Sequence, residues 1–493
     1  MEKWRGRVSA VAAEAIAGGA GVFFVAAYLL VAVQRLAYPF DLEWMEGSMV
    51  HHVSRVLDAK PLYGPPTLDF VPFLYPPLYY YVSAVPARVT GLGFLPLRLV
   101  SFASSLVIFW LIYRLAQRET ESRYAGIAAA GLFAATYRIG GAWFDLARND
   151  SLFLALMLAA IYLIRWRESG PGWAWAGLLL ALAALTKQTA LLMAPLLVLY
   201  AALVDWRKAA LLTVTCAGVF GAATWALNMR THGWYVYYVF RLPRQIQQAA
   251  ADRFPFWTHD IFAAIPIASA LGLATLVAVL RRRDRRSTFW PMMACAGISA
   301  AWLSRLHIGA YDNVLIPAYV CLCLLAGIAG RRLPDRLPVR HRPLVRVAIA
   351  ALSVIQMATL RYSIKAQTPS ARDAEAALQL GRRLAESGGH VFAPFHSFIP
   401  TPSGAIMSAH SWAVFDVLRA GDAAAAARLG GEIKHAFDQG EYGIVVIDKV
   451  EPWMEPDLDR GYRLSGPALD SDSLWTRTGY HTRPRWIYVP RSP

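Results

Sequence analysis

Long apolar runs recur along most of this chain, and they limit its possible folds more than any other feature. Of the 493 residues, 56% are hydrophobic. They gather in stretches of about 20 residues, the length that a helix needs to cross a bilayer. Soluble domains rarely concentrate their apolar residues in this way. The sequence therefore predicts a polytopic α-helical membrane protein with about eleven transmembrane helices. Their predicted centres are Gly21, Leu106, Leu132, Met157, Leu179, Leu196, Val219, Ala270, Ala296, Val320 and Leu352.

The basic residues predict the orientation of these helices. The formal net charge is +16, and the arginines and lysines fall mostly in alternate short loops, where the positive-inside rule expects them on the cytoplasmic side. The N-terminus is then cytoplasmic and the region after the last span extracytoplasmic, in a multi-pass protein of the cytoplasmic (inner) membrane. This distribution favours membrane lipids and a phosphate-bearing substrate as partners, and it argues against nucleic acid.

Two regions follow from this pattern. Residues 1–360 form the predicted transmembrane domain, with a first external loop at about 37–97. In that loop we expect two helices at the membrane interface, over 49–57 and 76–89. Residues 361–493 form a predicted small, soluble α/β domain. It has helices over 370–387 and 422–437 and strands over 390–394, 443–448 and 486–489.

The first external loop carries the most distinctive chemistry. Asp41, Glu43 and Glu46 follow the first span directly, where carboxylates are costly unless they serve a function. In an extended segment, the spacing of Asp41 and Glu43 puts both on the same side. We expect Asp41 to act as a general base while Glu43 orients the substrate or holds a cation. A helix N-cap explains Asp41 without function, and the helix dipole explains Glu46. The functional alternative for Glu46 is a contact with the substrate.

Further polar residues lie at the other external turns. Arg148 can bind two phosphate oxygens with its planar fork, and Asp150 can orient a ligand or cap the helix that it begins. Lys187 and Gln188 interrupt a long apolar stretch, where an ammonium needs a partner such as a phosphate, unless it reaches the headgroups by snorkelling. We expect Arg148 and Lys187 to bind phosphate, and Asp150 and Gln188 to bind substrate.

Two more segments complete the predicted site. His307, Tyr311 and Asp312 open the tenth span and can hydrogen-bond sugar hydroxyls, although a capped turn explains part of this pattern. The aromatic loop 234–257 carries Arg241 and Arg244 as additional phosphate ligands. This loop is either a lid over the substrate or an amphipathic helix at the interface.

Together these features resemble the GT-C superfamily of membrane glycosyltransferases. The similarity rests on the acidic motif after the first span, two interfacial helices, the segment Tyr75-Pro76-Pro77-Leu78 and the external Lys187. It covers about the first 330 residues and is strongest to glycosyltransferase family 39, which includes protein O-mannosyltransferases and lipid A aminoarabinose transferases.

The resemblance implies an inverting transfer of a sugar from a polyprenyl-phosphate donor to a glycan, lipid or protein acceptor outside the cytoplasmic membrane. It assigns the catalytic carboxylate to Asp41 and the second external acid to Asp150. The aminoarabinose transferases have lysine where this chain has Tyr75, so Tyr75 is a substrate contact and other cations must hold the phosphate. No cofactor and no metal site is required, although a divalent cation that bridges Asp41 or Glu43 to the phosphate is compatible with the pattern.

Two other functions fit a polytopic membrane protein. One is a transporter or flippase of lipid-linked saccharides, but the chain lacks the internal repeats with paired broken helices that are common in transporters. The other is a membrane scaffold for an envelope-assembly complex, with the C-terminal domain as its binding module. Release of free polyprenyl phosphate distinguishes the enzyme from both.

Overall fold

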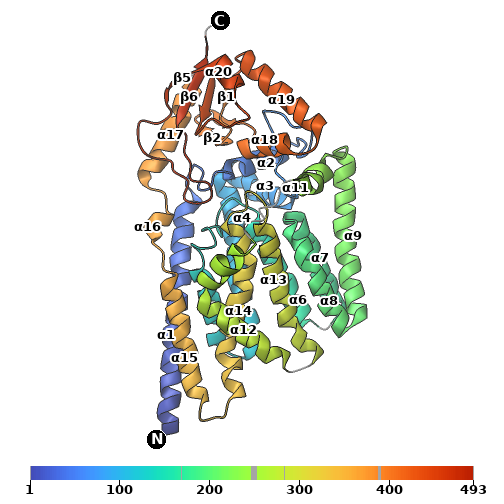
Figure 1. The fold of residues 1–493 in the computed structure, drawn as a ribbon, viewed down its shortest axis with the longest axis vertical. Coiled ribbons are helices and arrows are strands. Elements are labelled where there is room, and N and C mark those ends of the chain that lie inside the picture. Colours follow the sequence, from blue (N-terminus) through green and yellow to red (C-terminus); the bar gives the residue numbers. More distant parts are fainter. Residues whose placement is uncertain (1, 168, 246–252, 282–283, 387–389, 492–493) are drawn as a thin grey trace.

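A computed structural model describes the chain apart from residues 1, 168, 246–252, 282–283, 387–389 and 492–493. A bundle of long helices makes up most of the molecule, and a smaller domain built around a sheet covers one end of it (Figure 1). Each of the eleven predicted span centres lies within a helix. These helices are α1 (Glu2–Leu36), α4 (Phe94–Thr120), α5 (Arg123–Ala135), α6 (Asp150–Trp166), α7 (Gly170–Thr186), α8 (Thr189–Val204), α9 (Trp206–Arg230), α12 (Pro266–Leu280), α13 (Phe289–Arg305), α14 (Ile316–Arg332) and α15 (Arg342–Thr359).

The bundle has the length and composition of a membrane domain. Within the described residues, five helices are long and apolar enough to cross a bilayer, or six if the bent pair Phe256–Ala263 and Pro266–Leu280 forms one span. Helices α7 and α8 are shorter apolar helices. The predicted total of about eleven spans stays a prediction.

Small residues let the helices approach each other closely. A Cβ atom on Gly131 would lie 2.2 Å from the Cα of Gly21, so the backbones of α1 and α5 are in direct contact. Likewise, a Cβ atom on Gly327 of α14 would lie 2.6 Å from the Cβ of Ala129. Close approach at small residues is how apolar helices associate in lipid, where the hydrophobic effect does not drive their association. Helix α14 is consequently almost entirely buried in the bundle.

The first external loop contains both predicted short helices, α2 (Glu46–Leu57) and α3 (Leu78–Thr90). Helix α3 exposes Tyr81, Val85 and Val89, as expected for a helix at the membrane interface. Helix α2 differs from that prediction because its residues from Glu46 to Ser54 are all buried. They share a hydrophobic core with Phe395, Phe398 and other residues of the C-terminal domain. The apolar face of α2 is therefore covered by protein.

The C-terminal domain contains a four-stranded sheet in the order β1-β4-β6-β5. Strand β1 (Val391–Phe392) runs parallel to β4 (Ile444–Ile447), whereas β6 (Trp486–Pro490) is antiparallel to both β4 and β5 (Tyr462–Pro467). The predicted helices and strands are all present. The hairpin β2–β3 (Phe398–Thr401 and Gly404–Met407), β5 and three short helices were not predicted from the sequence. The helices of this domain are α16 (Ile364–Gln367), α17 (Ala371–Glu386), α18 (Ser411–Arg419), α19 (Ala423–Asp438) and α20 (Asp457–Gly461).

Candidate functional site

A buried arginine holds the acidic loop in place through hydrogen bonds and an ion pair. Arg98 of α4 donates hydrogen bonds to the carbonyl oxygens of Tyr38 and Phe40 and forms an ion pair of 2.7 Å with Glu46. Glu46 also accepts hydrogen bonds from the backbone N–H groups of Leu42 and Ala147. Burial raises the pKa of Glu46, but Arg98 outweighs this effect and the pKa ends below its ordinary value. The contacts of Glu46 thus hold the loop together, and it does not line the cavity described below.

Asp41 is joined to the C-terminal domain through a histidine. One oxygen of Asp41 accepts from the Gly47 N–H at 2.8 Å, and the other lies 2.9 Å from Nδ1 of His396. Nε2 of His396 lies 3.1 Å from Asp448. A Cβ atom on Gly47 would lie 2.9 Å from the Phe398 backbone nitrogen, so only glycine fits here. Both oxygens of Asp41 are therefore engaged, in a contact that the sequence analysis missed because His396 lies far away in the chain.

This buried Asp–His–Asp chain makes stability depend on pH. Burial alone lowers the pKa of His396, but Asp448 and Asp41 outweigh it and raise the pKa to about 10 from 6.5. The stabilisation from the charged imidazole is complete below pH 6.5 and disappears as the pH rises through 10. We expect the half-life of the detergent-solubilised protein at elevated temperature to shorten from pH 7 to 10. His396→Gln should flatten this dependence. Identical pH slopes for the variant and the wild type would rule out this role of His396.

Glu43 and Arg148 form the second feature of the loop. Nη1 of Arg148 donates to Glu43 at 2.9 Å, and Nη2 donates to the Tyr75 hydroxyl at 3.0 Å. Two atoms of the group have no hydrogen-bond partner among the described residues, although both are buried: Nε of Arg148 and Oε1 of Glu43. Burial raises the pKa of Glu43 to about 8, against the opposing effect of Arg148. The pair therefore retains an unused donor and an unused acceptor.

Arg148 lines a cavity of about 490 Å³ at the end of the bundle that the C-terminal domain covers, whereas Glu43 is not among its lining residues. Several of the predicted site residues line it together. They are Tyr75, Arg148, Lys187, Gln188, Arg244, His307 and Tyr311. The volume is ordinary for a small-molecule site, and the lining is mostly apolar with a few converging polar groups, as such sites usually are.

Lys187 and Asp150 are paired with each other. The Lys187 ammonium contacts a carboxylate oxygen of Asp150, which also accepts from the Asn313 amide at 3.0 Å. Gln188 donates to the carbonyl oxygens of Leu74 and Val239, so it ties the loop before α3 to the segment after α9. Asn313 also lines the cavity, although it was not among the predicted site residues.

The remaining predicted residues differ in their positions. His307 and Tyr311 line the cavity, and burial lowers the pKa of His307. Asp312 instead pairs with Arg305 at 3.4 Å. Arg244 in α11 (Leu242–Gln245) lines the cavity, whereas Arg241 is exposed at the end of a π-helix and does not. Part of the predicted lid, residues 246–252, lies outside the described residues.

The C-terminal domain supplies one wall of the cavity. Trp412, Asp416 and Arg419 of α18 line it. Arg419 forms an ion pair with Asp416 and lies over the Trp412 ring. Burial raises the pKa of Asp416 to about 7, with Arg419 opposing. The sequence offered no sign of this wall, because nothing in a single chain indicates which face of a distant domain meets the bundle.

This arrangement, a helical bundle under a small α/β domain, resembles the fold of ArnT, and part of the bundle matches a mannosyltransferase family profile. Residues 75–230 match the family profile described as dolichyl-phosphate-mannose-protein mannosyltransferase. No curated protein matches the chain. Among solved structures, the chain is similar to ArnT from Cupriavidus metallidurans in the apo state, with a TM-score of 0.61 and 15% identity over 95% of this chain and 97% of that chain. It is also similar to the same protein bound to undecaprenyl phosphate, with a TM-score of 0.57 and 14% identity over the same shares.

These likenesses confirm the predicted resemblance to GT-C and family 39 glycosyltransferases. They also confirm the predicted fold class, an apolar helical bundle with a small C-terminal sheet domain.

Proposed function

We propose that the chain transfers a sugar from a polyprenyl-phosphate donor to an acceptor hydroxyl at the extracytoplasmic face of the membrane. The acceptor oxygen would attack the anomeric carbon as the bond from that carbon to the phosphate oxygen breaks, which inverts the configuration. The acceptor proton would go to a carboxylate, and the polyprenyl phosphate would leave as an anion. Support for the donor class comes from the similar ArnT structure, which holds undecaprenyl phosphate.

The observation that carries this proposal is the unused edge of Arg148. Its Nη1 is occupied by Glu43, its Nε has no partner among the described residues, and its Nη2 meets only the Tyr75 hydroxyl. The Nε and Nη2 atoms form the edge of a guanidinium that binds two oxygens of one phosphate. A buried donor without a partner is unfavourable, and a donor phosphate in the cavity would satisfy it.

Two more cations line the same cavity. Arg244 borders it from α11, and Lys187 borders it from the turn between α7 and α8. Donors fixed around a departing phosphate stabilise the charge that develops on it in the transition state. Because Lys187 is already paired with Asp150, we propose Arg148 as the principal phosphate ligand and Lys187 and Arg244 as auxiliary ones.

For the general base we propose Glu43. Its Oε1 is unused, and the carboxylate adjoins the phosphate ligand Arg148. A raised pKa suits this role, because proton transfer is most efficient when the pKa of the base is near the working pH. Asp41, with both oxygens engaged by Gly47 and His396, would act as a positioning residue that fixes the loop.

The direct test is release of free polyprenyl phosphate. Purified protein is mixed with a panel of polyprenyl-phosphate sugars and a membrane extract as the source of acceptor, and the lipid products are separated. A transferase releases polyprenyl phosphate and labels an acceptor. Neither a flippase nor a scaffold does so, and the absence of release from the whole panel would overturn the proposal.

The position of the basic residues leads to a prediction about sidedness. The turns that join α8 to α9 and α14 to α15 lie at the end of the bundle away from the C-terminal domain (Figure 1). The positive-inside rule makes that end cytoplasmic. In a background with the native cysteines replaced by alanine, Ala424→Cys should react with an impermeant thiol reagent in spheroplasts, whereas Val339→Cys should react only after lysis. The reverse pattern would refute the orientation.

A further inference from the structure

A second cavity, lined by several charged side chains, lies at the opposite end of the helical bundle from the candidate site. It has a volume of about 350 Å³. It is formed where α6, α8, α12 and α14 end and where α7, α9 and α13 begin. Asp150 and Arg165, at the two ends of α6, are separated by about 22 Å of helix. The two cavities are therefore separate sites.

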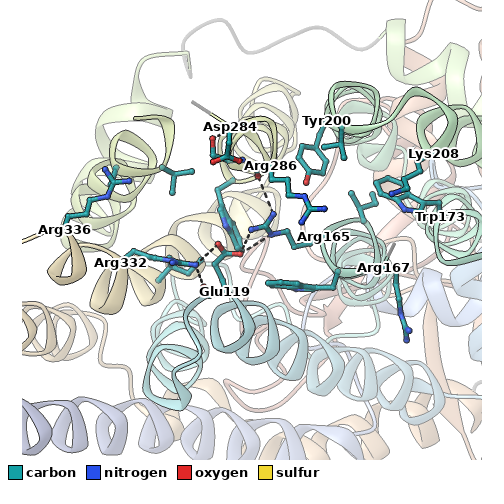
Figure 2. A pocket seen from close by; sticks show the side chains of 18 residues that line it. Glu119, Arg165, Arg167, Trp173, Tyr200, Lys208, Asp284, Arg286, Arg332 and Arg336 are labelled. Atoms are coloured by element: carbon teal, nitrogen blue, oxygen red, sulfur yellow. Dashed lines mark hydrogen bonds and ion pairs between the residues drawn. The ribbon is translucent and has the colours of Figure 1, made fainter. Parts of the chain in front are cut away.

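The charge of this second cavity is strongly positive. Six cationic side chains line it, against two carboxylates. The cations are Arg165, Arg167, Lys208, Arg286, Arg332 and Arg336, and the anions are Glu119 and Asp284. Figure 2 shows them arranged around one space, with Arg165 and Arg332 reaching Glu119 from different sides.

Both carboxylates already accept hydrogen bonds from groups of the protein. Glu119 accepts from Arg165 at 2.7 Å through one oxygen and from Arg332 at 3.3 Å through the other. Asp284 accepts from the Ser287 backbone N–H at 2.7 Å. The carboxylates that line this cavity are thus engaged within the protein and are outnumbered by the lining cations, one of which, Lys208, also lies 3.9 Å from Asp205.

Neutral donors add to the same wall. The indole nitrogens of Trp290 and Trp173, which are 1% and 3% exposed, have no hydrogen-bond partner among the described residues. Both tryptophans line the cavity. Indole, guanidinium and ammonium groups only donate hydrogen bonds. A ligand that complements the cavity therefore carries several acceptors and negative charge.

We infer that this cavity binds a phosphate-bearing anion, either the headgroup of an anionic phospholipid or a free phosphate compound. An ionised phosphate presents only acceptor oxygens and matches the arginine fork. The volume leaves room for more than the phosphate itself, such as the glycerol of a headgroup. Basic pockets between the ends of transmembrane helices are a recurring type of site for anionic headgroups. This inference is independent of the proposed glycosyl transfer.

The test measures stabilisation of the purified full chain in detergent micelles. Melting temperatures are recorded against dioleoylphosphatidylglycerol, dioleoylphosphatidylcholine and sodium phosphate, at constant ionic strength. We expect phosphatidylglycerol to raise the melting temperature and phosphatidylcholine to have little effect, because the cavity repels the choline cation. A response to phosphate as well would identify a free phosphate group as sufficient, whereas a response to phosphatidylglycerol alone would identify the lipid.

Variants of the lining residues test whether the rise in melting temperature comes from binding in this cavity. Arg167→Gln/Lys208→Gln removes two lining cations that do not contact Glu119, and Trp290→Phe removes the buried N–H group. Each should raise the half-maximal probe concentration about tenfold or more. The control Arg123→Gln/Arg340→Gln removes the same charge from exposed positions at the same end of the bundle and should respond like the wild type. Wild-type responses in both test variants, or no response of the wild type to any probe, would overturn the inference.

Discussion

Replacing Arg148 with alanine is expected to lower sugar transfer by about 10²–10³-fold, as loss of one transition-state anion donor does. The Arg148 side chain is buried and contacts Glu43 and Tyr75, and its Nε donor has no hydrogen-bond partner among the described residues. Arg148→Ala would remove both phosphate bonds at once and would leave Glu43 without its cation. The measurement is kcat/KM for release of polyprenyl phosphate by purified protein, together with the affinity for the donor.

Two further variants sharpen this test. Arg148→Lys should recover only part of the activity, because an ammonium cannot bind two phosphate oxygens while it also holds Glu43. Arg138→Ala, at an exposed position in the same loop, is the matched control and should behave like the wild type. Unchanged kcat/KM in Arg148→Ala would assign the phosphate to Lys187 and Arg244 instead.

Glu43→Gln is expected to reduce transfer by about 10²–10⁴-fold, the range for loss of a general base. Glutamine keeps the size of the side chain and an oxygen that can accept from Arg148, but it cannot take up a proton. The variant should therefore fold and bind donor as the wild type does. This combination, a lost rate with intact stability, distinguishes a chemical role from a structural one.

The pH dependence of the rate separates Glu43 from Asp41. A base works when it is deprotonated, and a raised pKa keeps the proton on until higher pH. With Glu43 as the base, transfer should rise with pH through about 8 and then level off. Burial raises the pKa of Asp41 to about 6, against the effect of His396, so a rise centred near 6 would identify Asp41 as the base. If Asp41 is the base, Asp41→Asn should abolish transfer. If Glu43 is the base, Asp41→Asn should mainly lower the melting temperature, because it removes the charge that faces His396 in the buried contact.

Much of the bundle could be predicted because each span carries its own signal. Apolar runs of sufficient length define helices locally, and every predicted centre lies in one. The misplacement of α2 has a different origin. The sequence predicts a helix at the membrane interface here, but hydrophobicity alone does not say whether lipid or protein covers the apolar face of a helix.

The candidate site could be predicted only in part, for the same reason. Charged and polar residues at the ends of spans stand out in a sequence, and Arg148, Lys187 and His307 all line the cavity. How these charges pair could not be read from spacing. Asp41 meets His396, and Lys187 meets Asp150 instead of remaining free for a ligand. Such pairings depend on tertiary contacts between residues that are far apart in the chain.

The contact between Asp41 and His396 also has a consequence for biosynthesis. The two residues are 355 positions apart. At ordinary rates of translation, about 5–20 residues per second, the acidic loop would leave the ribosome roughly 20 s or more before its histidine. Until then Asp41 lacks this partner, and the backbone carbonyl of Leu42 lacks the N–H of Arg477 that later binds it. The candidate site is thus completed late in synthesis. With the proposed function, a nascent chain that has inserted its helices but not yet folded its C-terminal domain would not begin to use lipid-linked sugars.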